Sequence, residues 1–120
     1  MKISHCLLVF LISLQACHQS KKDKADNPGM AFDKNKWSIK KDDDYPYRDS
    51  MLNDIIVTKL VKGLKPDKVI ALLGEPERID TNFMFYRISQ ERLGFWPIHT
   101  KTLVLEFGPD TTVKYNWIHQ

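Results

Sequence analysis

The sequence predicts an α+β domain in which two short helices pack on a three-stranded antiparallel sheet, in the order ααβββ, over residues 48–120. Three observations support this fold class. Apolar residues recur at helical spacing in the first part of this stretch, and they alternate with polar residues in its last part. Glycine and proline separate the segments. The chain of 120 residues is long enough for one such domain and too short for two.

The first helix is predicted from apolar residues that share one helical face, namely Met51, Leu52, Ile55, Ile56 and Leu60. We expect Asp49 or Ser50 to cap its start. Gly63 suits the left-handed conformation that ends many helices, so the first helix is expected to run up to this residue.

A second helix is expected directly afterwards. Pro66 has no N–H to lose at the first helical position, and Asp67 lies near the positive end of the helix dipole. Gly74 ends the helix before Pro76 turns the chain into the sheet. The inward face of this helix consists of Val69, Ile70, Leu72 and Leu73.

Three strands are predicted at residues 83–88, 102–107 and 113–117. The first is rich in aromatic residues, and the other two alternate apolar and polar residues on either side of a Gly-Pro-Asp turn. These last two strands are expected to form a hairpin with one apolar face. Residues 90–101, between the first two strands, are expected to form a long loop.

The N-terminus has the pattern of an export signal. Lys2 precedes an apolar run at residues 7–14, which is far shorter than the roughly 20 residues of a membrane-spanning helix but suits a signal peptide. The run ends in Leu-Gln-Ala-Cys, which resembles the lipobox of bacterial lipoproteins. We expect cleavage between Ala16 and Cys17, so that residues 1–16 are the signal peptide. The alternative is an ordinary secretory signal with an incidental cysteine.

In this interpretation Cys17 carries covalent diacylglycerol and an N-acyl lipid, and no other cofactor is predicted. Two or more acyl chains anchor a protein stably in a membrane. The next residue is His18 and not the Asp that retains lipoproteins at the inner membrane. This difference favours the outer membrane, with the domain facing the periplasm.

Lysine and aspartate are frequent in residues 17–47, and aliphatic side chains are few. Such a segment buries too little apolar surface to offset the entropy of ordering it. We therefore expect a flexible charged tether after the lipidated cysteine, with a reach on the order of 30 Å. The alternative is that Trp37 and Ile39 add a short strand or dock on a partner.

Two motifs in the helical region carry a resemblance to a known family. They are Gly-Leu-Lys-Pro-Asp-Lys-Val at residues 63–69 and Leu-Leu-Gly-Glu-Pro at residues 72–76. Together with the strands and the lipobox, they are similar to the SmpA/OmlA (BamE-like) group of small outer-membrane lipoproteins, over residues 50–118. The resemblance implies the fold of the β-lactamase inhibitor protein and an accessory role in the machine that inserts β-barrels into the outer membrane. Residues 90–101 depart from the family pattern.

No catalytic or metal-binding constellation is present in the sequence. Both cysteines lie within the first 17 residues, which excludes a disulfide scaffold and a cysteine-based zinc site. The mature histidines at positions 18, 99 and 119 lack ligand spacing, so no metal site is predicted. Basic and acidic residues are interleaved at a formal net charge of +3, which argues against nucleic acid as a partner. We predict that the chain is not an enzyme.

An aromatic patch is the remaining candidate site. If Met84, Tyr86 and Ile88 face the helices, the residues between them lie on the opposite face of the sheet. Aromatic side chains are enriched at binding hot spots. The candidate partner-binding residues are Phe83, Phe85, Phe95, Trp96 and Trp117. The alternative is that this face packs inward or that the predicted loop at residues 90–101 covers it.

These observations favour a membrane-anchored, protein-binding lipoprotein of the cell envelope. The first hypothesis is an accessory scaffold in outer-membrane protein assembly, with a β-barrel assembly component as its partner. The second is an inhibitor or immunity-type module that blocks an envelope enzyme. The third is a sensor whose sheet and long loop enclose a small ligand.

Overall fold

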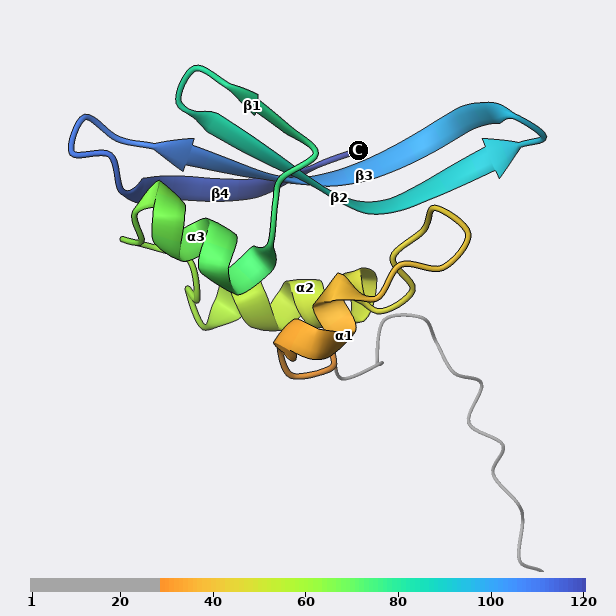
Figure 1. The fold of residues 1–120 in the computed structure, drawn as a ribbon, viewed down its shortest axis with the longest axis horizontal. Helices are drawn as coiled ribbons and strands as arrows, with labels where there is room; N and C mark the ends of the chain where they lie inside the picture. Colours follow the sequence, from red (N-terminus) through yellow and green to blue (C-terminus); the bar gives the residue numbers. More distant parts are fainter. Residues whose placement is uncertain (1–28) are drawn as a thin grey trace, which may run out of the picture.

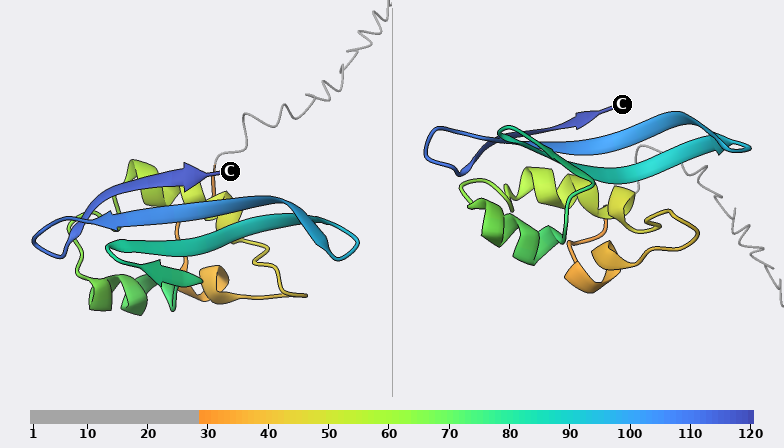
Figure 2. Two further views of the ribbon diagram at one scale, coloured as in Figure 1. Left: turned by 90° about the horizontal axis from the view of Figure 1, so that it is seen from above. Right: turned by 45° about the horizontal axis from the view of Figure 1, so that its top comes forward.

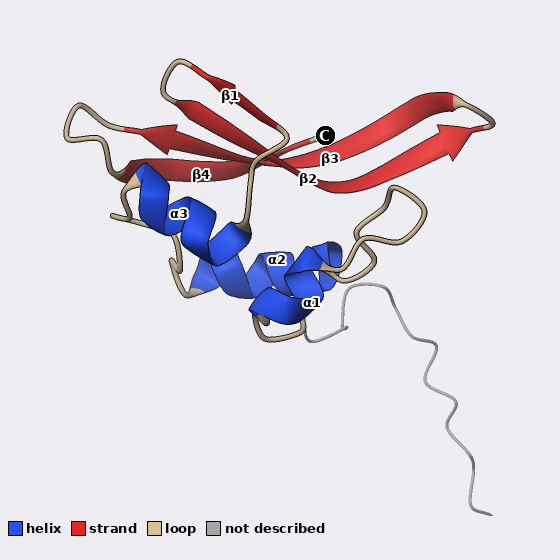
Figure 3. Ribbon diagram, in the orientation of Figure 1, coloured by secondary structure: helices blue, strands red, loops and turns tan. Residues whose placement is uncertain are grey.

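Three short helices pack against one face of a four-stranded antiparallel sheet, whose strand order is β1-β2-β3-β4 (Figures 1 and 3). This computed structural model describes residues 29–120, and the predicted signal peptide, cleavage site and Cys17 lie outside them. The elements are α1 (Lys34–Ser38), α2 (Arg48–Val57), α3 (Pro66–Leu73), β1 (Arg78–Asp80), β2 (Phe83–Leu93), β3 (Trp96–Phe107) and β4 (Val113–His119). The predicted α+β class is confirmed, whereas the prediction of two helices and three strands is wrong by one helix and one strand.

The segment before α2 belongs to the folded domain, so the prediction that residues 17–47 form a flexible tether is wrong from residue 29 onward. Trp37 in α1 is fully buried, and its indole Nε1 donates a hydrogen bond to the carbonyl of Leu73 at 2.8 Å. The Asp33 side chain caps α1 by accepting hydrogen bonds from two backbone N–H groups. The composition of the segment is charged on average, but Met30, Phe32 and Trp37 pack on the core, whereas Ile39 and Tyr47 stay exposed.

Two hydrogen bonds hold the first described residues along α2. The N–H of Met30 donates to the carbonyl of Ser50 at 2.7 Å, and the N–H of Phe32 donates to the Asp54 carboxylate at 2.7 Å. The side chains of Met30 and Phe32 pack against the core cluster. The folded domain therefore includes the residues from 29 onward, whereas the sequence predicted a boundary at residue 48.

A buried arginine ties this segment to the sheet. Arg48 is 5% exposed, and its guanidinium donates to the carbonyls of Trp37 at 3.0 Å and Arg87 at 2.8 Å. The guanidinium carbon also lies 3.3 Å from the centroid of the Tyr45 ring and 4.6 Å from that of Trp37. Burial lowers the pKa of Arg48 below its ordinary value, although a guanidinium keeps its charge in proteins.

Helix α2 is shorter than predicted, because it ends at Val57 and not near Gly63. Neither Asp49 nor Ser50 caps it, since Tyr47 is the N-terminal cap residue and makes no side-chain hydrogen bond there. Gly63 does adopt a positive φ of 79°. Its N–H donates to the carbonyl of Val113 at 2.9 Å, so this glycine joins the helical layer to the start of β4.

Helix α3 begins and ends where the sequence predicts. Pro66 lies in its first turn, and Gly74 follows it with a φ of 81°. The carbonyls at this end accept hydrogen bonds from distant side chains, because Trp37 donates to Leu73 and the Tyr86 hydroxyl donates to Gly74 at 2.8 Å. Carbonyls that lack partners within the helix are thereby satisfied in the interior.

The predicted loop at residues 90–101 is part of two long strands. The pairing of β2 with β3 continues out to Leu93 and Trp96, where a tight turn joins the strands. Shifts in the pairing after Arg87 and after Glu91 break the two-residue alternation. Because each bulge places an extra residue on one strand, the sequence in this region does not read as a strand. Strand β1 is missed for another reason, since its three residues are all exposed.

A further bulge divides the apolar residues of β4 between two faces. Val113 is buried opposite Phe107, and the pairing then shifts so that Leu105 and Leu103 face Asn116 and Ile118. Tyr115 and Trp117 consequently lie on the side of the sheet away from the helices. The predicted single apolar face of the last hairpin is therefore wrong.

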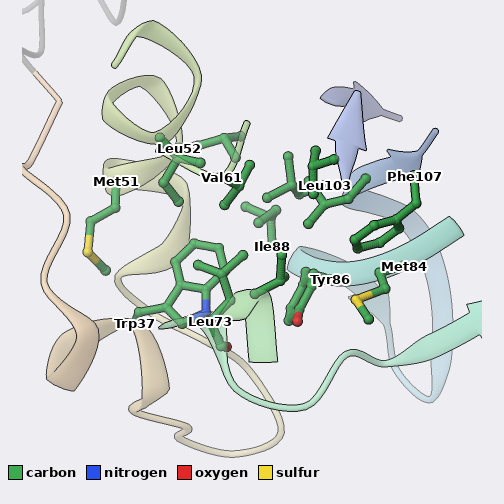
Figure 4. Packing of buried hydrophobic residues seen from close by; sticks show 14 residues of the cluster. Trp37, Met51, Leu52, Val61, Leu73, Met84, Tyr86, Ile88, Leu103 and Phe107 are labelled. Carbon is green, nitrogen blue, oxygen red and sulfur yellow. Dashed lines mark hydrogen bonds between the residues drawn. The ribbon is translucent and has the colours of Figure 1, made fainter. Parts of the chain in front are cut away.

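The core lies between the helices and the inner face of the sheet (Figure 4). Met84, Tyr86 and Ile88 of β2 are buried and face the helices, as predicted. Leu103, Leu105 and Phe107 of β3 lie beside them, and α1, α2 and α3 contribute Trp37, Met51, Ile55, Val69 and Leu73. No helix among residues 29–120 has both the length and the apolar composition that crossing a bilayer requires.

Candidate functional site

The outer face of the sheet, on the side away from the helices, carries an open concavity of about 740 Å³ that we call the outer groove. Its lining residues come from the loop before β1 and from all four strands. They are Glu77, Arg78, Asp80, Phe83, Phe85, Arg87, Gln90, Thr100, Thr102, Val104, Trp117 and His119.

Aromatic side chains form the floor of the outer groove. The Phe83 ring lies edge-on to Trp117 with the centroids 6.1 Å apart, and its centroid is 6.3 Å from that of Phe85. Val104 lies in the same groove and is only 3% exposed. A sheet face that meets water ordinarily carries polar side chains. The apolar floor of the outer groove departs from this pattern.

Charged groups line the rim at the β1 side. The guanidinium carbon of Arg78 lies 4.2 Å from the centroid of the Phe85 ring, a cation–π distance. Arg87 forms an ion pair with Glu77 at 3.5 Å and donates a second hydrogen bond to the carbonyl of Asp43. The Nε of Arg87 is buried and has no hydrogen-bond partner among the described residues.

The five residues of the predicted aromatic patch fall into two separate surfaces. Phe83, Phe85 and Trp117 come together in the outer groove, as the alternation along the strands predicts. Phe95 and Trp96 do not line the groove. They lie at the turn between β2 and β3, where Phe95 is 100% exposed and Trp96 is 78% exposed.

Sequence reasoning identified three of the twelve groove residues and missed nine, among them Val104, Arg78 and Arg87. Val104 occupies an outward position between the inward Leu103 and Leu105, and an apolar residue at such a position was a readable signal. Arg78 was not recognisable because β1 was read as loop. Arg87 follows the outward spacing of Phe83 and Phe85, but its ion pair with Glu77 depends on the path of the chain before β1.

Tyr86 and Asp110 have shifted pKa values, and neither residue lines the outer groove. Burial raises the pKa of Tyr86 far above its ordinary value, and its hydroxyl donates to the Gly74 carbonyl. Hydrogen bonds from Thr112 lower the pKa of Asp110 in the turn before β4. Residues 29–120 hold no group of three or more His, Cys, Asp or Glu side chains placed to bind a metal ion. The outer groove combines aromatic side chains on its floor with charged side chains on its rim.

No protein-family model matches the chain, and neither a curated protein nor a solved structure matches it. The resemblance to the SmpA/OmlA group rests on the motifs at residues 63–69 and 72–76 and stays a prediction.

Proposed function

We propose that this chain is a membrane-anchored, non-enzymatic lipoprotein whose outer groove binds another protein of the cell envelope. The observation that carries the proposal is the aromatic floor of Phe83, Phe85 and Trp117 on a sheet face that no part of residues 29–120 covers. Figure 2 shows the helices on the other side of the sheet.

The groove has the composition of a binding hot spot. Trp and Arg are over-represented at such sites, and a partly desolvated surround strengthens each contact. Trp117 is 39% exposed, so a partner has side-chain surface to cover, while Val104 beneath it is already buried. Arg78 and Arg87 stand beside Glu77 and Asp80, so the rim provides both signs of charge to orient a partner.

The envelope location rests on the sequence before the described residues. The Leu-Gln-Ala-Cys motif ending at Cys17 supports lipidation, and His18 supports the outer membrane with the domain facing the periplasm. The resemblance to the SmpA/OmlA group supports a component of outer-membrane protein assembly as the partner. Membership of the BamE-like fold family, which the resemblance implies, is part of this proposal.

Cross-linking in living cells, followed by capture of the tagged chain and mass spectrometry, tests the proposal. Trp117→Ser should abolish capture of the partner. Tyr115→Ser is the matched control, because Tyr115 lies on the same strand and is 55% exposed but does not line the groove. A Cys17→Ala strain shows which contacts depend on anchoring.

The identity of the captured protein decides between the functional classes. Enrichment of a β-barrel insertase with its companions supports the assembly scaffold. Enrichment of a single hydrolase or toxin supports the inhibitor or immunity module. If the Trp117→Ser chain is folded and captures the same partner as the unaltered chain, the groove is not the binding surface.

A small-molecule sensor is the second candidate, and the size of the groove favours it. Ligand pockets commonly measure about 300–1,000 Å³, and the outer groove of about 740 Å³ falls within that range. A rise in melting temperature with an envelope metabolite, absent in Phe83→Ser, would support this function. A melting temperature that no offered metabolite changes would contradict it.

A further inference from the structure

The far end of the β2–β3 hairpin is a two-stranded projection, which we call the distal hairpin and define as residues 89–101. Strand β1 pairs with β2 only up to Phe85, and β4 pairs with β3 only as far as Thr102. Beyond these points β2 and β3 pair only with each other, out to the turn (Figure 1). An isolated two-stranded hairpin is marginal in water, so this projection has little support of its own.

The tip of the distal hairpin is apolar on several sides. Leu93 and Trp96 are opposite each other in the pairing and are 73% and 78% exposed. Phe95 occupies the turn and is 100% exposed, and Ile98 is 53% exposed. Pro97 pairs with Arg92 and is exposed as well. Contiguous exposed apolar side chains of this size mark an interaction site.

The shape of the tip favours a fluid occupant. A protein groove covers one face of an inserted element, whereas a bilayer surrounds an inserted tip on every side. Leu93 and Trp96 lie on one face of the hairpin, Pro97 lies on the other, and Phe95 lies at the end. Tryptophan also prefers the boundary between hydrocarbon and headgroups, where its ring is partly wet.

The charges behind the tip fit a phospholipid surface. Residues 92–105 contain no Asp or Glu, and the one carboxylate of the distal hairpin, Glu91, lies behind Arg92 and pairs in register with His99. Arg92 donates to the Gln90 side chain at 2.9 Å and forms no ion pair among the described residues. Lys101 lies further from the tip and pairs with Asp49 at 2.9 Å. An arginine one residue from an apolar tip lies at the depth of the phosphates when the tip enters the hydrocarbon.

The start of the described chain lies near the base of the distal hairpin. Met30 is hydrogen-bonded to Ser50, and the adjacent Asp49 contacts Lys101 at the base of the hairpin. Cys17 and Gly29 are 29 − 17 = 12 residues apart. A fully extended chain of this length spans at most about 40 Å. The hairpin from Lys101 to Trp96 rises about 17 Å at the usual rise per strand residue.

We propose that the tip of the distal hairpin, Leu93 to Ile98, inserts into the surface of a phospholipid bilayer. The orientation of the domain toward the membrane rests on the proposed lipid on Cys17. The insertion of the tip does not depend on it. Together the lipid and the tip make two contacts with the bilayer, and they leave the outer groove free for a protein partner.

Quenching of tryptophan emission by brominated phospholipids tests this proposal. The full chain is reconstituted into vesicles of phosphatidylethanolamine and phosphatidylglycerol that carry bromine on their acyl chains. The chain has three tryptophans, of which Trp37 is buried and Trp117 lies in the outer groove. We expect part of the emission to be quenched, and we expect Trp96→Phe to lose that part while Trp117→Phe retains it.

A second variant keeps the reporter and removes the neighbouring apolar side chain. Phe95→Ser should reduce the quenching of Trp96, whereas Tyr115→Ser on the outer face should leave it unchanged. The proposal is overturned if Trp96 in vesicle-bound chain is insensitive to brominated lipid and remains open to aqueous acrylamide. A photo-reactive residue at position 95 that cross-links to a protein and not to lipid would overturn it too.

Metabolic labelling with a fatty acid, in the unaltered and Cys17→Ala strains, examines the anchor separately. Quenched Trp96 in a chain that takes up no label leaves the insertion proposal standing and removes the lipid anchor. A labelled chain whose Trp96 is not quenched supports the lipid anchor and removes the insertion proposal.

Discussion

The two halves of the β2–β3 hairpin are built from the same pair of strands but meet very different surroundings. In the near half, Tyr86 and Leu103 are fully buried under the helices, and β1 and β4 extend the sheet on both sides. In the distal hairpin, Leu93 and Trp96 are mostly exposed and no third strand is present. The contrast teaches that apolar residues in the near half stabilise the fold, while those in the distal half are available for contact.

Truncation of one tryptophan in each region should give the largest difference. Trp37→Ala removes a fully buried ring and the hydrogen bond to Leu73, and should lower the free energy of unfolding by about 3–5 kcal/mol. Trp96→Ala at the exposed tip should change it by about 0.5 kcal/mol or less. Urea denaturation measures both. Equal effects would show that residues 29–47 are not part of the core.

A matched pair of isoleucines sharpens the comparison within one hairpin. Ile88 is fully buried, and Ile88→Ala should cost about 2–5 kcal/mol. Ile98 is 53% exposed, and Ile98→Ala should cost well under about 1 kcal/mol. Thermal unfolding of the two variants reports the difference. A large loss with Ile98→Ala would mean that the distal hairpin is buried against another part of the molecule.

Tyr86 should make the near half sensitive to alkaline pH. Because burial raises its pKa, the folded chain keeps the phenolic proton at pH values where the unfolded chain releases it. The contribution to stability is complete below about pH 10 and falls above it, by about 1.4 kcal/mol per pH unit. Tyr86→Phe should lower the stability at neutral pH by about 1 kcal/mol, through the lost hydrogen bond to Gly74, and flatten this alkaline decline.

Tyr115→Phe is the control for the tyrosine experiment, because Tyr115 is 55% exposed. Its curve of unfolding free energy against pH should follow that of the unaltered chain. A Tyr86→Phe chain with the same alkaline decline as the unaltered chain would show that other groups cause it.

The smallest effect is expected at the contact that joins the distal hairpin to the helices. Lys101 and Asp49 form an ion pair at 2.9 Å, and their side chains are 28% and 56% exposed. Exposed pairs contribute about 0–1 kcal/mol and weaken with salt, so Lys101→Ala should cost about 0.5 kcal/mol at low ionic strength and less at high salt. A cost that salt leaves unchanged would point to packing of the lysine chain.

Local signals made α3 and the near half of the β2–β3 hairpin predictable. Pro66 and Gly74 set the limits of α3 by backbone chemistry that acts within a few residues, and alternation along β2 placed Phe83 and Phe85 on the outer face. Helix α1 was missed because Trp37 lies among lysines. The average composition of the segment is charged, so it gives no sign that a single tryptophan side chain is buried in the core.

The remaining errors have causes that lie outside any short window. Bulges after Arg87 and Glu91 hid the distal strands, since an extra residue reverses the alternation that identifies a strand. Phe95 and Trp96 were grouped with Phe83 because the length of the hairpin that separates them was unknown. The rim of the outer groove depends on the path of the chain from α3 to β1. The pairing of β1 with β2 sets that path.

The burial of Trp37 has a consequence for how strong the proposed contacts need to be. The described part of the domain starts at residue 29, which is 29 − 17 = 12 positions after Cys17, whereas the predicted boundary at residue 48 is 48 − 17 = 31 positions after it. If Cys17 carries the lipid, the shorter link confines the domain to a thin layer above the membrane, at an effective concentration on the order of millimolar. Contacts that are weak in dilute solution are then occupied most of the time. A modest groove and a small apolar tip are sufficient at such a concentration.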